Sequence, residues 1–258
     1  MRLGLIADIH GNLVALDAVL ASLAAARVDE VVCLGDVAAL GPQPSEVISR
    51  LREIGCQTVL GNTDAWLLPD PQLPATPPTS TAVSELTRWC ADQLSNADRR
   101  ALSELPVELT LSLATTHLYC FHASPRSLDD VIAATTPDAD LAAMLGERAA
   151  PLVAGGHTHI QLLRRWGEAL VLNPGSVGLP GVGPGDPRLP VNRDVHWAEF
   201  AIVDVSARGT SIDLRRLPLN LDGVLAAVVE SGMPHRDWWA GLWGIGRGRG
   251  RGRPRPRF

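Results

Sequence analysis

Short polar motifs follow a series of apolar, β-branched segments along this chain, and their order constrains the fold more than any other feature. Each motif stands at or just beyond the end of a predicted strand, where an α/β sheet delivers side chains into a cleft. A single pair of such residues would be a weak signal, but five clusters that each follow a predicted strand indicate one common site. Their seven metal-binding side chains are Asp8, His10, Asp36, Asn62, His122, His157 and His159.

The first third of the chain alternates predicted strands and helices, which indicates two βαβ units and a parallel sheet. Buried strands are expected at residues 2–8, 30–36 and 56–62. Helical periodicity or flanking signals predict helices at residues 12–26, 45–54, 84–94 and 97–104. The five prolines between residues 68 and 79 predict a loop there.

The second half contains one predicted helix, residues 138–148, and a run of strands separated by turns, as in a largely antiparallel sheet. The expected strands are residues 107–113, 117–123, 151–156, 160–166, 169–175, 197–205 and 210–217. We therefore expect an α/β protein in which two mixed β-sheets pack face to face with helices outside. No long linker interrupts the chain, so residues 1–235 are expected to form one domain that includes a short helix ending near Gly232.

Residues 236–258 form a segment rich in Trp, Arg and Gly that is expected to be disordered, although its tryptophans are expected to dock on the body. Six arginines fall in the last twelve positions, and without them the net charge of −5 would become −11. An acidic body argues against broad nucleic-acid binding by the folded part. The arginine-rich tail remains an alternative contact for RNA, polyphosphate or an anionic surface.

Composition places the chain among ordinary globular proteins, with 46% hydrophobic and 20% charged residues. No apolar stretch approaches the roughly 20 residues that span a bilayer, and the N-terminus lacks the layout of a signal peptide. The four cysteines form no CxxC pair, and three of them lie in predicted strands. These features favour a reducing, cytoplasmic location.

Carboxylate, amide and imidazole ligands together can bind a pair of Mn, Fe, Zn or Ni ions, and two metals in one cleft suit phosphoester hydrolysis. Asp36 follows the second strand, between Asp8 after the first and Asn62 after the third, which makes it the natural bridging ligand. The spacing of His157 and His159 allows each imidazole to reach a different metal. With only two carboxylates among the ligands, two divalent ions would leave a net positive site that favours a phosphate anion.

The pattern D-x-H, GD, GN-x-D, H, GH-x-H resembles that of the calcineurin-like metallophosphoesterase superfamily. The segments DIHGNLVAL, CLGDVAALGPQPSEV, HASPRS, GGHTH, NPGSVGLP and GDPR further resemble a branch of small prokaryotic phosphodiesterases, over about residues 1–205. The resemblance implies a four-layer αββα sandwich and a site for two divalent metals, with Mn favoured. It assigns Asp8, His10, Asp36 and His159 to one metal, and Asp36, Asn62, His122 and His157 to the other. Of these residues, Asp36, Asn62 and His122 are expected to be catalytic.

One position departs from the family pattern, because Thr63 stands where many relatives have a histidine that contacts phosphate and protonates the leaving group. A threonine can donate a hydrogen bond but cannot act as a general acid near pH 7. We therefore expect a preference for diesters with good leaving groups.

The remaining candidates have weaker signals. Thr63, Arg126, Arg188 and His196 are predicted substrate contacts, with solvated loop or ordinary surface positions as the alternative for the arginines and the histidine. Asp64 is expected to brace its loop, and Asn173 to stabilise a turn or support the site.

Together these features predict a dinuclear metal-dependent phosphodiesterase that acts by direct attack of a metal-bridging hydroxide on a nucleotide-like or other phosphodiester. The alternatives are a phosphomonoesterase, a dinucleoside-polyphosphate hydrolase, or a non-catalytic metal-binding interaction module on the same fold.

Overall fold

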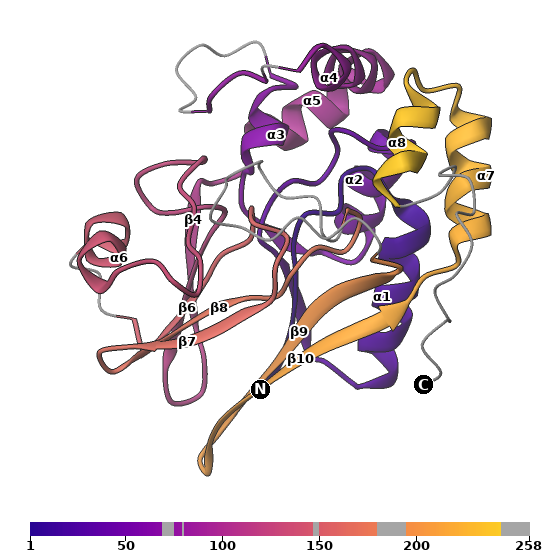
Figure 1. Ribbon diagram of the computed structural model, residues 1–258. Coiled ribbons are helices and arrows are strands. Elements are labelled where there is room, and N and C mark those ends of the chain that lie inside the picture. The colour runs from indigo at the N-terminus through magenta and orange to yellow at the C-terminus, as the bar shows by residue number, and fades with distance from the viewer. Residues whose placement is uncertain (69–74, 79, 147–149, 180–194, 244–258) are drawn as a thin grey trace, which may run out of the picture.

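Two five-stranded sheets packed face to face form the centre of the protein (Figure 1). The computed structural model describes residues 1–68, 75–78, 80–146, 150–179 and 195–243. Helices cover the outer face of each sheet, so the predicted four-layer αββα sandwich of two mixed β-sheets is confirmed.

The first sheet joins the N-terminal strands to a C-terminal hairpin, in the order β10-β9-β1-β2-β3. Strands β1, β2 and β3 run parallel, whereas β9 pairs antiparallel with both β1 and β10. The strands span Arg2–Ile6 (β1), Glu30–Cys33 (β2), Gln57–Thr58 (β3), Trp197–Ser206 (β9) and Gly209–Pro218 (β10). All five lie within or close to the predicted segments, and β1, β2 and β3 each end a few residues before a polar motif.

The second sheet has the order β4-β5-β6-β8-β7. Its three central strands, β5, β6 and β8, run parallel, and the edge strands β4 and β7 are antiparallel to their neighbours. The strands span Glu108–Ser112 (β4), His117–Phe121 (β5), Leu152–Ala154 (β6), Leu162–Trp166 (β7) and Ala169–Asn173 (β8).

The expectation of a largely antiparallel second half is confirmed for the pairs β4–β5, β7–β8 and β9–β10, but these strands do not form one antiparallel sheet. The central strands of the second sheet are parallel, and the hairpin β9–β10 leaves that sheet to pair with β1, where Leu3 stands opposite Val203. The pairing covers an edge of β1 that would otherwise expose unpaired backbone groups. Strand β9 suits this inner position because seven of its ten residues are buried, as expected for a strand covered on both faces.

Alternation along the strands divides the core into layers. Leu3 and Leu5 of β1 pack with Leu118 of β5 between the two sheets. Ile6 faces the other way, into a cluster with Leu16 of helix α1 (Leu13–Ala25). Burial of each such side chain stabilises the fold by about 1.5–3 kcal/mol, so the alternating pattern holds β1 between the opposite sheet and the helix layer.

Eight helices flank the sheets within the described part of the chain. They span Leu13–Ala25 (α1), Pro44–Glu53 (α2), Asn62–Ala65 (α3), Thr81–Gln93 (α4), Asn96–Ser103 (α5), Asp138–Leu145 (α6), Leu221–Ser231 (α7) and Arg236–Leu242 (α8). Helix α1 begins after Asn12, whose side chain accepts a hydrogen bond from the Ala15 amide at 3.1 Å. Helix α7 ends at Gly232, as expected, in the left-handed conformation. Among the described residues, no helix is both long enough and apolar enough to cross a membrane.

The expected disorder of residues 236–258 is wrong for its first part, because Arg236–Leu242 form helix α8. Trp239 is 0% exposed and Trp243 2% exposed, so the expected docking of the tryptophans is confirmed for these two, whereas Trp238 is 42% exposed. Burial of two large aromatic side chains offsets the entropy lost when this segment becomes ordered. The arginine-rich residues 244–258 lie outside the described residues.

Candidate metal centre

The predicted ligands lie together at one end of the sandwich, beyond the carboxyl ends of strands from both sheets. The first sheet supplies the ligands that follow β1, β2 and β3, and the second sheet supplies those that follow β5 and β6. All seven are buried, with at most 6% of each residue exposed: Asp8, His10, Asp36, Asn62, His122, His157 and His159. The site therefore forms where the two sheets meet, and neither sheet contains it alone.

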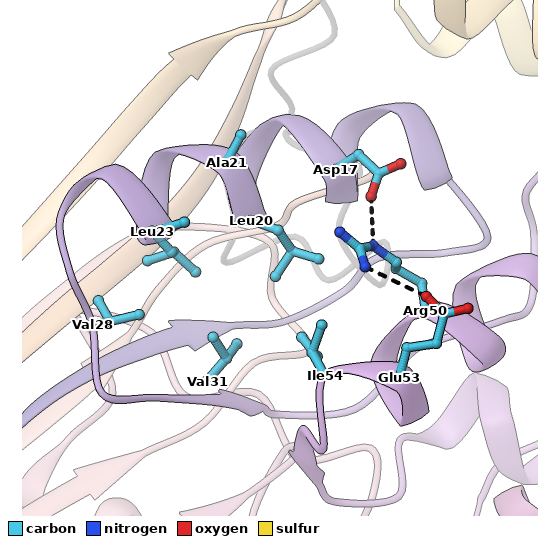
Figure 2. A pocket seen from close by; sticks show the side chains of 10 residues that line it. Asp17, Leu20, Ala21, Leu23, Val28, Val31, Arg50, Glu53 and Ile54 are labelled. Carbon is cyan, nitrogen blue, oxygen red and sulfur yellow. Dashed lines mark hydrogen bonds and ion pairs between the residues drawn. The ribbon is translucent and has the colours of Figure 1, made fainter.

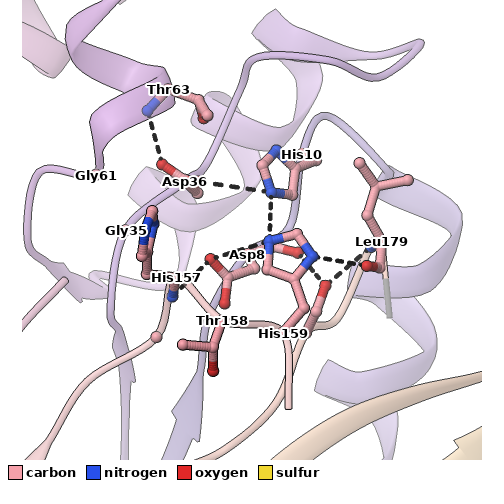
Figure 3. A network of polar contacts seen from close by, with 12 residues as sticks. Asp8, His10, Gly35, Asp36, Gly61, Thr63, His157, Thr158, His159 and Leu179 are labelled. Atoms are coloured by element: carbon pink, nitrogen blue, oxygen red, sulfur yellow. Dashed lines mark hydrogen bonds and ion pairs between the residues drawn. The ribbon is translucent and has the colours of Figure 1, made fainter. Parts of the chain in front are cut away.

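Four of these residues form a compact first cluster, in which one ligand atom from each lies within 4.8 Å of all the others: Asp8, His10, Asp36 and His159. His10 Nε2 lies 3.6 Å from Asp36 Oδ2, and His159 Nε2 lies 3.5 Å from Asp8 Oδ1. Figure 3 shows the two imidazoles directed toward each other between the carboxylates. This set of donors is the one that the family resemblance assigns to the first metal.

The tautomers of His10 and His159 follow from the partners of their Nδ1 atoms. His10 Nδ1 lies 3.1 Å from the Ala39 carbonyl oxygen, and His159 Nδ1 lies 2.7 Å from that of Leu179. Because a carbonyl only accepts, each Nδ1 carries the proton and each Nε2 presents a lone pair. The two Nε2 atoms face each other at 3.1 Å. Two lone pairs at this distance repel, and a metal cation bound by both would make the arrangement favourable.

The other three residues form a second cluster around the side-chain oxygen of Asn62. Asn62 Oδ1 lies 2.9 Å from His122 Nε2 and 3.1 Å from His157 Nδ1. His122 Nδ1 donates to the Leu34 carbonyl at 2.7 Å, so its Nε2 also presents a lone pair. This lone pair faces an amide oxygen, which is again an arrangement that suits a cation.

Asp36 connects the two clusters through its two carboxylate oxygens. Its Oδ2 faces His10 in the first cluster, and its Oδ1 lies 3.5 Å from His122 Nε2 in the second. The Thr63 amide also donates to Asp36 Oδ1 at 2.9 Å, which fixes the carboxylate between the clusters. Gly61 passes so close that a Cβ at this position would stand 2.1 Å from the same oxygen.

Burial sets the protonation of the site. It lowers the pKa of His10 and His159 to about 3 and that of His122 and His157 to about 4, so all four imidazoles are neutral near pH 7 and able to bind metal. Burial, followed by the neighbouring Asp36 carboxylate, raises the pKa of Asp8 well above its usual range. A bound cation would offset the cost of both buried carboxylates.

Several buried polar atoms at the site have no hydrogen-bond partner among the described residues. They include Asp8 Oδ2, His157 Nε2 and Thr63 Oγ1. Such atoms are rare in folded proteins, because an unsatisfied buried polar group costs about 1–3 kcal/mol. Their presence beside facing lone pairs fits a site built to receive metal ions and a polar substrate.

Strained backbone conformations are also concentrated among the residues of the site. Within the described ranges, eight non-glycine residues have positive φ, and five of them are predicted ligands: Asp8, His10, Asp36, His157 and His159. Such conformations cost about 1–3 kcal/mol each and concentrate at functional sites. The sharp turns that follow the strands direct these side chains inward.

Two further polar residues support the loops, as the sequence predicts. The buried Asp64 carboxylate accepts hydrogen bonds from the amides of Val37, Ala38 and Gly61, at 2.9, 3.1 and 3.2 Å. Asn173 donates to the Gly156 carbonyl at 2.6 Å. Asp64 thereby links the loop that carries Asp36 to the loop that carries Asn62.

The residues predicted to contact the substrate have different surroundings in the structure. Thr63 lies at the site, beside Asp36. The Arg126 guanidinium is paired with Asp130 by two bonds, at 2.7 and 3.2 Å, and His196 Nε2 contacts the Trp243 carbonyl at 2.9 Å. Arg188 lies outside the described residues. A phosphate contact by Arg126 would therefore have to displace an ion pair.

Sequence reasoning does not identify the three carbonyl groups that orient the histidines, which belong to Leu34, Ala39 and Leu179. Every residue carries a carbonyl, so no pattern in the sequence distinguishes these three.

A separate groove of about 560 Å³ lies between α1 and α2, lined by apolar side chains such as Leu20 and Val31 (Figure 2). Its charged groups are paired with one another: Arg50 Nε donates to Asp17 at 2.8 Å, and Arg50 Nη1 lies 3.4 Å from Glu53. None of the predicted ligands is among the residues that line it. The groove therefore has no chemistry comparable to that of the metal centre.

Comparisons with known proteins agree with this geometry. An uncharacterized protein of Methanocaldococcus jannaschii is 26% identical over 90% of this chain and 93% of its own length. A metallophosphoesterase from Sphaerobacter thermophilus is 25% identical, with a TM-score of 0.71 over 95% of this chain and 99% of that one. A hypothetical protein from Pyrococcus horikoshii shares the fold at 19% identity, with a TM-score of 0.77 over 95% and 96% of the two chains. The family model of the calcineurin-like phosphoesterase superfamily domain matches residues 1–206. With that match and the buried Asp/His centre, the chain belongs to the calcineurin-like phosphoesterase superfamily.

Proposed function

We propose that this protein is a phosphodiesterase that uses two divalent metal ions. The observation that carries the proposal is the pair of unprotonated Nε2 atoms of His10 and His159, which face each other at 3.1 Å. The Asp8 and Asp36 carboxylates lie within 3.6 Å of these nitrogens. A buried arrangement of this kind is explained by a cation, and the family supports a phosphoester as the substrate.

The two clusters suggest one metal each, with Asp36 as the shared ligand. Asp8, His10 and His159 would complete the first position, and Asn62, His122 and His157 the second. When bound, two such ions neutralise phosphoryl oxygens and lower the pKa of water, which supplies a nucleophile near pH 7. Direct attack by water on phosphorus would invert its configuration.

The charge balance of the site favours an anionic substrate. The four histidines are held neutral by burial, so only Asp8 and Asp36 contribute negative charge among the proposed ligands. Two divalent ions would leave this set with a net positive charge. A phosphoester would therefore be attracted to the site.

Thr63 supports a diester as the preferred substrate. Its amide is bound to Asp36, and its buried hydroxyl has no partner among the described residues. The hydroxyl can donate to a phosphoryl oxygen, but its pKa is too high for a general acid near pH 7. Alkyl monoesters, whose leaving groups most need a proton, would be poor substrates.

The ligand set suits Mn, Fe, Zn and Ni, and we propose Mn for the first assays. The four cysteines are free and three of them are buried, which is consistent with the proposed location in a reducing cytoplasm.

The test compares rates on metal-stripped protein reloaded with Mn²⁺, using an aryl phosphodiester and the matching monoester. The control is Asp36→Asn, which keeps the size of the side chain but removes the charge shared by the two clusters. Turnover of the diester that requires metal and collapses in Asp36→Asn would support the proposal.

Two results would point elsewhere. Faster turnover of the monoester than of the diester would favour a phosphomonoesterase. Turnover of neither ester, with the protein folded and metal bound, would favour a polyphosphate substrate or a non-catalytic metal-binding module; assay of a dinucleoside polyphosphate then separates these two.

A further inference from the structure

Helix α8 lies beyond residues 1–206, which the family model matches, yet it packs in one apolar cluster with residues of the loops that surround the metal centre. It lies beside α7 (Figure 1). The indole Nε1 of Trp239 donates to the Leu40 carbonyl at 2.7 Å. Trp239 is 0% exposed and the hydrogen bond is partly buried, so its loss would leave the buried indole N–H unpaired.

Leu40 is joined to the first cluster through its neighbours in sequence. The preceding residue, Ala39, provides the carbonyl that receives the Nδ1 proton of His10. The following residue, Gly41, lies against the His10 backbone so closely that a Cβ there would stand 1.7 Å from the His10 carbonyl oxygen. Leu40 itself has a φ of +72°, which is unfavourable for a leucine and requires support from its surroundings. Trp239 contributes such support from outside the loop.

The same tryptophan cluster contacts the loop that orients the other imidazole. Leu179 is 3% exposed and packs in one apolar cluster with Trp239 and Trp243. Its carbonyl receives the Nδ1 proton of His159 (Figure 3), and the two atoms lie 2.7 Å apart. The rings of Trp239 and Trp243 lie 5.7 Å apart, so the cluster is continuous from Leu40 to Leu179.

We propose that α8 is a positioning element of the metal centre. Trp239 holds Leu40, and the Trp239–Trp243 pair holds Leu179. The carbonyls of Ala39 and Leu179 then keep the Nε2 lone pairs of His10 and His159 directed at one point. Partners that orient a metal-binding histidine typically change metal affinity about 10–100-fold when they are removed. The inference rests on the metal centre of the proposed function and does not depend on which phosphoester is hydrolysed.

The test uses Trp239→Phe, which keeps an aromatic ring but removes the indole donor. Trp238→Phe is the matched control, because it makes the same chemical change on the same helix at a residue that is 42% exposed. Mn²⁺ affinity of the metal-stripped full chain is measured by calorimetry, at a temperature where circular dichroism shows both variants folded. We expect Trp239→Phe to bind Mn²⁺ about 10-fold or more weakly and Trp238→Phe to bind like the wild type.

A merely structural role would lower the melting temperature of Trp239→Phe while leaving its Mn²⁺ affinity at the wild-type value, and this result would overturn the proposal. A second readout is the exchange rate of the His10 Nδ1 proton in metal-free protein, measured by NMR. Faster exchange in Trp239→Phe than in Trp238→Phe is expected, and equal rates would refute the positioning role. If the wild type bound no Mn²⁺, the proposed function would fail, but the exchange rates would still decide the role of α8.

Discussion

Substitution of Gly61 by alanine should disable the site by displacing Asp36. The added Cβ would stand 2.1 Å from Asp36 Oδ1 and 2.3 Å from the Asp36 amide nitrogen. Gly61 has a φ of −95°, which alanine adopts without strain, so the effect should be purely steric.

The size of the effect follows from this overlap. Real Cβ atoms essentially never come within 3.0 Å of another heavy atom, so the carboxylate or its loop must move by about 1 Å. A misplacement of about 1 Å at a catalytic centre costs about 10²-fold, which corresponds to about 2.7 kcal/mol. Overpacking should also destabilise the fold by about 1–3 kcal/mol.

Three measurements check this expectation: Mn²⁺ affinity by calorimetry, kcat on an aryl phosphodiester, and thermal unfolding. Gly241→Ala is the control, since a Cβ at that helical position meets no atom within 4 Å. It should leave affinity and kcat unchanged and stabilise the helix by about 0.5–1 kcal/mol. A folded Gly61→Ala protein with wild-type Mn²⁺ affinity and kcat would refute the steric reasoning.

Three further predictions concern neighbouring residues. When the pH falls from 8 to 5.5, the unfolding free energy of metal-free wild type in urea titrations should decrease by about 1 kcal/mol more than that of metal-free His157→Gln. The reason is that burial lowers the pKa of His157 to about 4, so only the unfolded histidine takes up a proton as the pH falls below 6.5; equal losses would contradict this account. Asp64→Asn should lower the unfolding free energy by about 2–3 kcal/mol in the same assay, because one amide oxygen cannot accept from three backbone amides. An unfolding free energy within about 0.5 kcal/mol of the wild-type value, which is typical of a neutral surface substitution, would contradict this prediction. Thr63→His should raise turnover of an alkyl monoester and add an ionisation to the pH–rate profile, since it supplies an acid beside Asp36; unchanged rates and profile would argue against a missing acid.

Much of the site is predictable from the sequence because metal ligands are side chains with distinctive chemistry. Asp8, Asp36 and Asn62 follow three parallel strands, and the carboxyl ends of parallel strands meet at one edge of a sheet. Local signals also locate helix α1, whose capping residue Asn12 precedes a regular apolar face.

Local sequence patterns do not determine which distant segments pair with each other. The short turn between β9 and β10 indicates that they pair with each other, but only the free edge of β1 decides that the hairpin joins the first sheet. The same holds for helix α8, because its local sequence does not show that Trp239 and Trp243 pack in one apolar cluster with residues of the folded body.

The sequence by itself determined which side chains could bind a metal and in what order they occur, since ligand chemistry belongs to the residue type. Only the tertiary structure decided how those side chains are oriented. The Ala39 and Leu179 carbonyls set the tautomers of His10 and His159, and Trp239 supports the loop that contains Ala39. Backbone groups are the same at every position, so their contribution exists only once distant parts of the chain are brought together.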